Sequence, residues 1–261
     1  MVKTALITGA SGGIGYELAK IHAEHGGNLV LVARNKEKLD KLKNELEEKH
    51  GVVVHTIQKD LSLHGAAYDI YNKVNDLNIE IDYLINNAGH GDFSMFAESD
   101  WPKQERMINL NITALAHLTR LFLPQMIARK NGRILNVASV ASFVPGPTMS
   151  VYFASKAFVL SFSEAIAEEV SRQGITVTAL CPGPTESNFH AIARDGKKGK
   201  DRKMLSAREV SEYGYKSMLK GKVVAVPGIL YAMVPFMLRF IPRFLTARII
   251  RKAQEDKHTS V

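Results

Sequence analysis

The sequence predicts an α/β protein with a doubly wound parallel sheet of about seven strands and helices on both faces of that sheet. Three observations support this fold class. Short apolar or β-branched runs alternate with helix-periodic segments over the first 180 residues, and the links between them are short. A glycine-rich turn joins the first apolar run to the first helical segment. No internal linker interrupts the pattern, so we expect residues 1–261 to form a single domain.

Each element is predicted from its own local pattern. The strand signal lies in residues 2–8, 28–33, 52–57, 82–86, 133–138, 175–180 and 223–226. Helical periodicity lies in residues 14–26, 36–49, 61–77, 101–129 and 151–173. In the second helix, Leu39, Leu42 and Leu46 form one apolar stripe. The fourth helix begins with Ser99 or Asp100 as the cap and Pro102 in the first turn.

Composition limits the class of protein. A hydrophobic fraction of 46% is ordinary for a soluble globular chain, and we expect a cytoplasmic protein because the first apolar run is too short for a signal peptide. The single cysteine, Cys181, excludes an intramolecular disulfide and a multi-cysteine metal site, and we expect no metal. Since Cys181 follows an apolar run, we expect a buried structural thiol.

The chemistry is predicted to centre on Tyr152 and Lys156. Their spacing places the phenol and the ammonium one turn apart on the same face of a helix. A tyrosine has a pKa of roughly 10 in water, and a neighbouring cation lowers that pKa by stabilising the phenolate. The pair would therefore transfer a proton nearer to neutral pH. Ser139, at the end of the preceding strand, would bond a substrate carbonyl oxygen beside the tyrosine.

The turn Thr8–Gly15 is predicted to hold the pyrophosphate of a dinucleotide. Gly9 allows a tight turn, Gly13 permits close approach of the phosphates, and Gly15 permits packing of the helix on the strand. The N-terminus of the following helix offers backbone N–H groups and a favourable dipole to the phosphates.

With these motifs in place, the chain resembles the short-chain dehydrogenase/reductase family over about residues 2–190. The shared motifs follow the family order: Thr8–Gly15, Asp60-Leu61, Asn86-Asn87-Ala88-Gly89, Asn111, Ser139, Tyr152 with Lys156, and Pro182-Gly183. The resemblance implies a Rossmann-type sheet and NAD(P)-dependent carbonyl or alcohol chemistry.

The resemblance also implies a catalytic tetrad of Asn111, Ser139, Tyr152 and Lys156. Tyr152 would be the acid in reduction, Ser139 would hold the carbonyl, and Lys156 would bond the nicotinamide ribose. Asn111 would hold a water through which protons reach Lys156, with Asn109 as a nearby competitor for that role. The chain departs from the family pattern at Ala114, where glycine is frequent; this change affects helix packing at most.

The remaining cofactor contacts are carried over in the same way. The predicted cofactor-binding residues are Gly9, Ser11, Gly13, Ile14, Gly15, Arg34, Asp60, Leu61, Asn87, Ala88, Gly89, Tyr152, Lys156, Pro182, Gly183 and Thr185. Asp60 would contact adenine, or alternatively cap a helix. The Asn87 loop would pack near the adenosine ribose or brace neighbouring strands. Pro182–Thr185 would hold the nicotinamide carboxamide, or form only a rigid turn.

The second strand decides between the two nicotinamide cofactors. An acidic residue at its end would bond the ribose 2′-hydroxyl and repel a 2′-phosphate. The sequence has Arg34 there instead, and its guanidinium can bind a phosphate through two N–H groups. Lys38 and Ser11 would add to the site, so we expect NADP(H) in preference to NAD(H). The alternative is a solvated arginine that only begins a helix.

The substrate side of the predicted site is less specific. His90, Phe93, Phe143, Val144 and Met149 would line an apolar pocket or belong to the core, and residues 186–203 would form a mobile lid. These walls favour a small hydrophobic ketone, aldehyde or acyl substrate. Two other functions compete: a nucleotide-sensing regulator, which has no need of the tetrad, and a nucleic-acid binder, which charge alone suggests. We therefore expect an enzyme that binds no nucleic acid.

The charge of the chain is concentrated in its last quarter. The net charge is +8, but residues 1–193 sum to −2, and no acidic residue occurs between Lys222 and Glu255. The extension over residues 228–261 mixes apolar side chains with arginines, and its prolines and charges argue against a membrane span. It would cap the substrate site, form an interface of a dimer or tetramer, or lie as an amphipathic helix on an anionic bilayer.

Overall fold

A computed structural model of the chain describes residues 2–186 and 204–255. Seven parallel strands form one sheet in the order β3-β2-β1-β4-β5-β6-β7, which confirms the predicted class. The strands are β1 (Thr4–Thr8), β2 (Asn28–Ala33), β3 (Val54–Gln58), β4 (Tyr83–Asn86), β5 (Gly132–Val137), β6 (Ile175–Leu180) and β7 (Val224–Ala225). The predicted lid falls almost entirely on residues 187–203, which lie outside the described residues.

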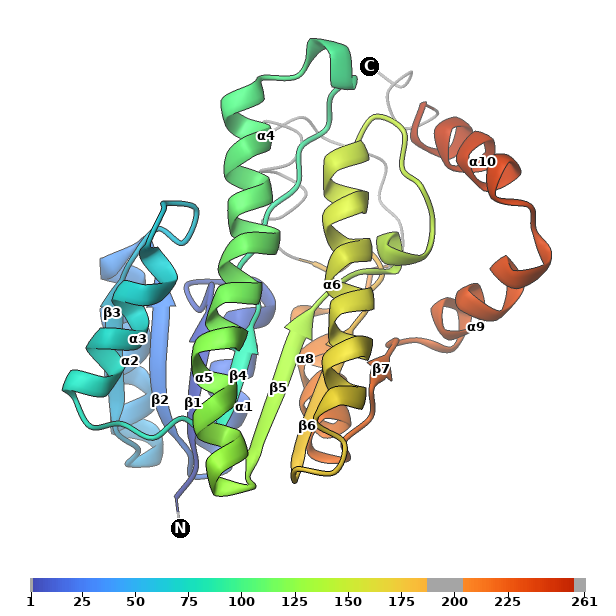
Figure 1. Cartoon of the computed structure of the whole chain (residues 1–261). Coiled ribbons are helices and arrows are strands. Elements are labelled where there is room, and N and C mark those ends of the chain that lie inside the picture. The colour runs from blue at the N-terminus through green and yellow to red at the C-terminus, as the bar shows by residue number, and fades with distance from the viewer. Residues whose placement is uncertain (1, 187–203, 256–261) are drawn as a thin grey trace.

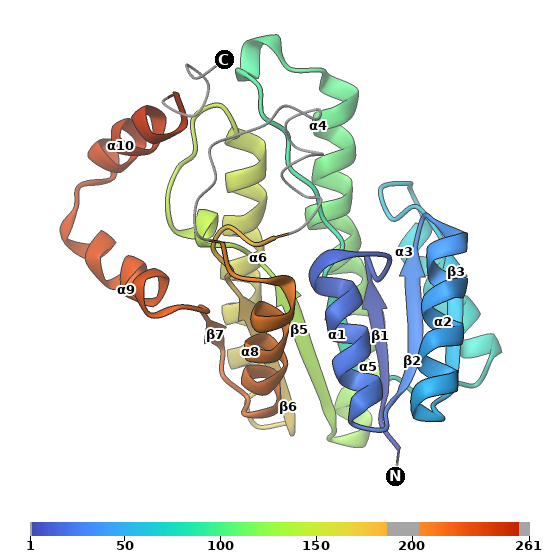
Figure 2. The same cartoon turned by 180° about the vertical axis from the view of Figure 1, so that it is seen from behind.

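Helices cover both faces of the sheet (Figure 1). The helices are α1 (Gly13–Glu24), α2 (Lys36–His50), α3 (Ala66–Asp76), α4 (Trp101–Ile108), α5 (Leu115–Arg129), α6 (Ser150–Glu169), α8 (Ala207–Leu219), α9 (Ile229–Met237) and α10 (Arg243–Glu255). Short 3-10 turns are η1 (Phe96–Glu98), η3 (Val140–Phe143) and η4 (Leu238–Phe240). Helices α1, α2 and α8 lie together on the face that Figure 2 turns to the viewer.

The side chains on the two faces of the sheet belong to two separate hydrophobic clusters. Ala5 and Ile7 of β1 pack toward α1, α2 and α8, together with the predicted stripe of Leu39, Leu42 and Leu46. The intervening Leu6 packs with the helices of the opposite face, where Phe122 of α5 is fully buried. This alternation follows from the period-two geometry of a strand that is covered on both faces.

The helix predicted over residues 101–129 contains a defect that the sequence pattern did not reveal. It is α-helical from Trp101 to Ile108 and again from Leu115 to Arg129, and the turn between them, η2 (Asn109–Ala114), is π-helical. Pro102 does lie in the first turn, but the N-cap Asp100 makes no side-chain capping bond. Turns of this kind are rare and often occur at functional sites.

The other predicted boundaries differ by a few residues. The largest difference is at α3, predicted from residue 61 but beginning at Ala66, because Gly65 adopts a φ of 75° and residues 61–65 form turns. Strand β1 begins at Thr4 and β3 at Val54, each two residues later than predicted. Within the described residues, no helix is both long and apolar enough to cross a membrane.

Near the amino ends of the strands, the His22 ring of α1 is buried, and each of its two nitrogen atoms has a hydrogen-bonding partner. Nδ1 lies 2.9 Å from the Tyr215 hydroxyl and Nε2 lies 3.1 Å from the Lys3 carbonyl oxygen. Burial lowers the pKa of His22 to about 4; the bond to Lys3 and the Asp82 charge only partly oppose this. The folded state therefore binds a proton less readily than the unfolded chain does.

Acidification is expected to weaken the fold through His22. Stability that depends on the neutral ring is fully present above about pH 6.5, the pKa of an unfolded histidine, and is lost as pH falls toward 4. The loss amounts to about 3 kcal/mol of unfolding free energy. Urea unfolding at a series of pH values measures this loss. His22→Gln should reduce the dependence of the unfolding free energy on pH, whereas the control His117→Gln, at an exposed position, should not. An unchanged pH dependence in His22→Gln would assign the acid sensitivity to other groups.

Candidate active site

The carboxyl ends of β1 and β4 meet at the point where the strand order reverses. Strand β1 pairs with β2 on one side and with β4 on the other, so the loops after β1 and β4 diverge from adjacent positions. Open α/β sheets bind their ligands at such a switch point. The predicted glycine turn, the Asn87 loop, Ser139 and the Pro182–Thr185 loop all follow carboxyl ends of strands, while Asn111 lies in the turn η2 between α4 and α5.

The glycine turn after β1 has the close packing that its spacing predicted. Gly9 has a φ of 67° and Gly13 one of 57°, values that favour glycine. A Cβ on Gly15 would lie 2.4 Å from Asn87 Nδ2 and 2.5 Å from the Gly9 carbonyl oxygen. Gly15 is therefore required for packing inside the turn.

The N-terminus of α1 fits an anionic ligand. Its N-cap Gly12 makes no side-chain capping bond, and no acidic residue occurs in the first turn. A Cβ placed on Gly12 would meet no atom within 4 Å, so open space adjoins the turn. Unsatisfied N–H groups at a helix start are suited to hold a phosphate, and these residues therefore fit the pyrophosphate of a dinucleotide.

Thr8 fixes the position of the loop after β4. Its hydroxyl accepts hydrogen bonds from the backbone N–H groups of Asn87 and Ala88, both at 3.0 Å. In return, Asn87 Nδ2 donates to the Thr8 and Gly9 carbonyl oxygens at 2.9 and 3.2 Å. Asn87 thus braces two strand ends, which was one of the two roles predicted for it.

Asn86 belongs to a buried polar network beneath the site. Its Nδ2 donates to Asn136 Oδ1 at 2.9 Å, and Asn136 Nδ2 donates to the Ser163 hydroxyl at 2.9 Å. These bonds join β4, β5 and α6, so the strand that ends before Ser139 and the helix that carries Tyr152 are fixed to each other. Buried amide groups are costly unless they are hydrogen-bonded, and the NH₂ group of each of these two asparagines has a partner.

Ser139, Tyr152 and Lys156 come together at the end of β5. Tyr152 and Lys156 lie one turn apart in α6, as predicted, and both are buried. The Ser139 and Tyr152 side chains hydrogen-bond each other, and the Ser139 hydroxyl also accepts from the Ala141 N–H at 3.1 Å. Lys156 Nζ donates to the Val137 carbonyl oxygen at 2.7 Å.

The pKa of Tyr152 differs in direction from the sequence-based prediction. Burial raises it to about 12, and the hydrogen bond from Ser139 opposes that rise only in part. Lys156 Nζ lies 6.0 Å from the ring centroid and bonds a carbonyl oxygen, so its charge does not offset the burial. Burial also lowers the pKa of Lys156 to about 8. Tyr152 is therefore a neutral phenol at physiological pH in this state of the chain.

Asn111 lies in the π-helical turn η2 and is buried, whereas its competitor Asn109 is only half-buried. Asn111 Nδ2 donates to the His90 carbonyl oxygen at 2.9 Å and to the Ser155 hydroxyl at 3.0 Å, and Oδ1 accepts from the His90 N–H at 3.1 Å. Both amide N–H groups are therefore occupied. The side chain fixes the loop after β4 against α6 and leaves no amide N–H for a water.

Gly89 brings that loop directly onto the tetrad. A Cβ on Gly89 would lie 3.0 Å from Asn111 Oδ1 and 3.4 Å from Lys156 Nζ. Together with Ser139 and Tyr152, these residues form one cluster around the ends of β4 and β5. Ser155 links α6 to Asn111. It was not predicted as part of the site, although it directly precedes Lys156 in the sequence.

Arg34 and Asp60 lie at the ends of β2 and β3. The Arg34 side chain is exposed beside the N-terminus of α2, where Asn35 rather than Arg34 caps the helix by accepting from the Lys38 N–H at 2.8 Å. Asp60 accepts from the Ser62 N–H and hydroxyl at 2.9 and 2.7 Å. Burial opposes ionisation of Asp60, but these bonds, aided by the Arg34 charge, hold its pKa below the usual value. Asp60 thus braces the turn before α3, and Leu61 beside it is buried.

The loop after β6 is covered by a residue that sequence reasoning did not identify. A Cβ on Gly183 would lie 2.7 Å from the ring of Tyr231 in α9. The Thr185 hydroxyl donates to the Gly183 carbonyl oxygen at 2.9 Å, and Val140 N–H donates to the Pro182 carbonyl oxygen at 3.0 Å. A lone tyrosine in an apolar stretch gave no signal of this contact.

The residues predicted to line the substrate site are all half-buried. They are His90, Phe93, Phe143, Val144 and Met149. Phe143 packs with the apolar cluster around Val159 and Cys181, and Met149 packs beside Tyr152. Cys181 is buried as predicted, and burial raises its pKa to about 12, so it stays a thiol.

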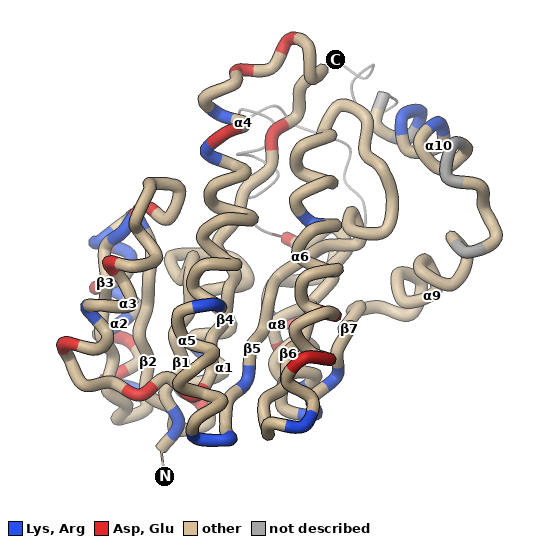
Figure 3. Tube along the Cα trace, viewed as in Figure 1, with Lys and Arg blue, Asp and Glu red and all other residues tan. Residues whose placement is uncertain are grey.

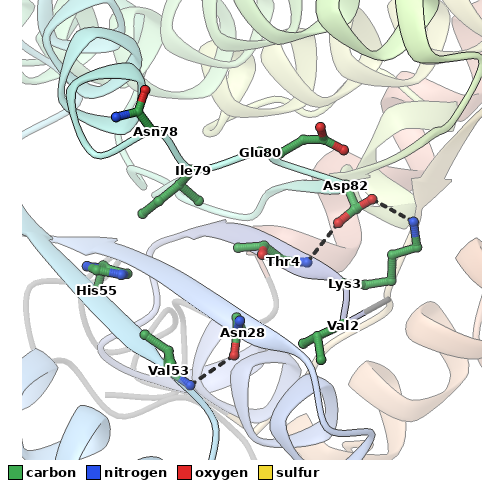
Figure 4. Close-up of a pocket in the computed structure, with 10 residues that line it drawn as sticks. All are labelled: Val2, Lys3, Thr4, Asn28, Val53, His55, Asn78, Ile79, Glu80 and Asp82. Carbon is green, nitrogen blue, oxygen red and sulfur yellow. Dashed lines mark hydrogen bonds and ion pairs between the residues drawn. The ribbon is translucent and has the colours of Figure 1, made fainter.

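A hollow at the opposite, amino edge of the sheet does not share this chemistry (Figure 4). Of its two carboxylates, Glu80 and Asp82, Asp82 accepts from Lys3 Nζ at 2.8 Å and from the Thr4 N–H at 2.9 Å. Asn28 Oδ1 accepts from the Val53 N–H at 2.9 Å. These groups join the starts of neighbouring strands, and the candidate active site remains at the carboxyl edge.

Comparison with known proteins settles the family. A sequence profile described as short chain dehydrogenase matches residues 3–198. The chain belongs to the short-chain dehydrogenases. It is an oxidoreductase of the NAD(P)-dependent type that this family comprises.

Two relatives of this short-chain dehydrogenase are named for an enzymatic activity. A very-long-chain 3-oxoacyl-CoA reductase from Anas platyrhynchos is 30% identical, over 97% of this chain and 84% of its own length. The human protein of the same name is 36% identical over 68% of this chain, and the match spans 58% of that longer protein.

Solved structures share the fold of this short-chain dehydrogenase. A short-chain dehydrogenase from Sphingobium yanoikuyae in complex with NADPH is 31% identical with a TM-score of 0.83, covering 100% of this chain and 96% of its own. A bulky-bulky ketone specific alcohol dehydrogenase from Comamonas testosteroni is 28% identical with a TM-score of 0.79, covering 100% and 95%.

Proposed function

We propose that this short-chain dehydrogenase is an NADPH-dependent carbonyl reductase that acts on a hydrophobic ketone, aldehyde or acyl substrate, or catalyses the reverse oxidation. The observation that carries the proposal is the convergence of Ser139, Tyr152 and Lys156 beside the glycine turn after β1. A proton donor and a dinucleotide site at one sheet edge are the two parts that carbonyl reduction requires.

The cofactor would lie across the switch point of the sheet. Its phosphates would take the N–H groups at the start of α1, around Gly13, Ile14 and Ser11, while Asn87, Ala88 and Gly89 would flank the adenosine ribose. Asp60 and Leu61 would lie at adenine, and the loop Pro182–Thr185 at the carboxamide. When bound, the nicotinamide supplies the hydride that reduces the carbonyl carbon.

The residues of the chain would manage the proton. Tyr152 donates its phenolic proton to the carbonyl oxygen, and Ser139 holds that oxygen. A pKa raised to about 12 keeps Tyr152 protonated, which is the form that an acid must have. Lys156 would bond the nicotinamide ribose. Because both N–H groups of the Asn111 amide are occupied, a water at Asn111 would bond to Oδ1 or to the main-chain carbonyl oxygen.

We propose NADPH in preference to NADH because Arg34 stands where a carboxylate would select the 2′-hydroxyl. Its guanidinium is exposed at the end of β2 and can bind a 2′-phosphate, and Lys38 in the next turn adds a second cation. The relative from Sphingobium yanoikuyae that contains NADPH supports this choice.

A hydrophobic substrate is supported by the half-buried side chains between Ser139 and Tyr152 and by the names of the relatives. One is specific for bulky ketones and another reduces very-long-chain 3-oxoacyl-CoA. A nucleotide-sensing regulator on the same fold is the second candidate, but a sensor has no need of the intact Ser-Tyr-Lys set. Cytoplasmic location and a dimer or tetramer stay predictions.

A turnover screen tests this proposal. We expect oxidation of NADPH with ketones and 3-oxoacyl thioesters of increasing chain length, faster with the bulkier apolar members. Cofactor binding is measured separately by the shift in melting temperature. Binding of NADPH without turnover across the panel would favour the sensor, and faster turnover of sugars than of apolar ketones would contradict the substrate class.

A further inference from the structure

Beyond β7 the chain forms an extended arm. We define the C-terminal arm as residues 229–255, which comprise α9, η4 and α10. Figures 1 and 2 both show it leaving the sheet beside β7 and curving back so that α10 lies near the loop that precedes α6. No residue of α9 is buried, unlike the helices that cover the sheet.

The exposed side chains of the C-terminal arm are strongly apolar. Leu230 is 82% exposed, Phe240 74% and Phe236 61%. The other large apolar residues that the arm exposes are Ile229, Met233, Met237, Leu245 and Ile249. The rings of Phe236 and Phe240 meet edge to face with their centroids 5.4 Å apart, so part of this surface is continuous. Single exposed apolar residues are normal, whereas a group of this kind marks an interaction surface.

The charges of the same arm are all positive before its last residue, Glu255. Arg248, Arg251 and Lys252 are exposed on α10. Figure 3 shows Lys and Arg positions on α10 and no Asp or Glu position on α9. The arm therefore presents apolar side chains and positive charge together.

The C-terminal arm is attached to the rest of the molecule at both ends. At its start, Tyr231 packs over Gly183 and Gly228 has a φ of 86°. At its end, Gln254 is buried and its Oε1 accepts from the Thr148 hydroxyl at 2.8 Å. The Thr148 carbonyl oxygen in turn accepts from the Ser94 N–H at 2.9 Å. The exposed residues lie between these two contacts, which join the arm to the loop after β6 and to the loop before α6.

Three occupants of this surface are conceivable, and charge separates them. The stretches 187–203 and 256–261 are rich in charged and polar residues, so they are poor covers for an apolar surface. A second copy in a two-fold contact would bring two cationic arms together without acidic partners. An anionic bilayer offers both acyl chains for the apolar residues and negative headgroups for the cations.

We propose that the C-terminal arm binds the surface of an anionic phospholipid bilayer. Its apolar side chains enter the boundary between headgroups and acyl chains, and the α10 cations lie among the headgroups. The proposal concerns binding alone and does not depend on the reaction, so it stands or fails separately from the proposed function.

Flotation of the full chain with vesicles tests the proposal. The chain should float with phosphatidylcholine vesicles that contain phosphatidylserine, and less in high salt, which screens the charged part of the attraction. Leu230→Glu with Phe236→Glu should lower the bound fraction by about tenfold or more, since each loses the burial of a large apolar side chain. Arg251→Gln with Lys252→Gln should reduce the preference for phosphatidylserine.

The matched control is Leu63→Glu with Tyr68→Glu, because these residues are 59% and 52% exposed but lie away from the arm. This control should float like the parent, and thermal melting confirms that every variant is folded. Absence of flotation by the parent chain, or equal loss in the control, would overturn the proposal. Parent dimers that the Leu230 and Phe236 changes dissociate, with no vesicle binding, would assign the surface to a second copy instead.

Discussion

Tyr152→Phe is expected to remove most carbonyl reduction while leaving NADPH binding nearly intact. The change deletes one oxygen from a buried ring, so the packing of Tyr152 beside Met107 and Ala141 is kept. The lost hydroxyl is the proposed proton donor, and removal of one general acid lowers kcat by roughly 10²–10⁴-fold. The measurement combines kcat with NADPH binding followed by fluorescence.

The control for Tyr152→Phe is Tyr213→Phe, in which a tyrosine of α8 outside the site loses the same atom. This control should keep the parent kcat. Reduction by Tyr152→Phe at the parent rate would show that another group supplies the proton. Loss of NADPH binding together with activity would instead indicate a role of the hydroxyl in holding the cofactor.

Arg34→Asp is expected to shift cofactor preference toward NADH. The substitution removes the proposed 2′-phosphate ligand and introduces a carboxylate that repels it, so the ratio of kcat/KM for the two cofactors should change by roughly 10²–10³-fold. Folding should be preserved, because Arg34 is exposed and the Gln58 amide bonds its main-chain oxygen, which the substitution retains.

The exposed arginine at position 172 provides a matched charge reversal for that experiment. Arg172 lies in the turn before β6, away from the end of β2. Arg172→Asp should therefore leave the ratio of kcat/KM for the two cofactors unchanged. An unchanged ratio in Arg34→Asp would place the 2′ group elsewhere on the protein. An equal shift in both variants would show that net charge, rather than the local contact, sets the preference.

Patterns local in sequence predicted the sheet and most of the candidate site. The apolar runs and the leucine stripe of α2 report burial directly, and the glycine spacing reports a turn that tolerates no side chain at Gly15. Ser139 and Tyr152 follow from a strand end and a helix start, which are well-marked positions. Such features need no knowledge of distant contacts.

Features that depend on tertiary contacts were not predicted. The sequence of α9 does not reveal that Tyr231 covers Gly183, because that contact joins segments far apart in the chain. The direction of the Tyr152 pKa was wrong for a related reason: spacing reveals a nearby cation but not the extent of burial, which here is the larger effect. The role of the C-terminal arm stays a proposal because its partner lies outside the chain.

The π-helical turn Asn109–Ala114 has a consequence for how this chain tolerates change in length. A π-turn holds one residue more than the regular helix would, so it is equivalent to a one-residue insertion that has been retained. Deleting Leu110 would restore a regular helix, and α4 and α5 would keep their relation to each other because the π-turn confines the extra residue to one turn. The wide turn that carries Asn111 would be lost, and with it the backbone position from which Asn111 bonds His90 and Ser155. A shortening of the chain here would therefore alter the site more than the fold.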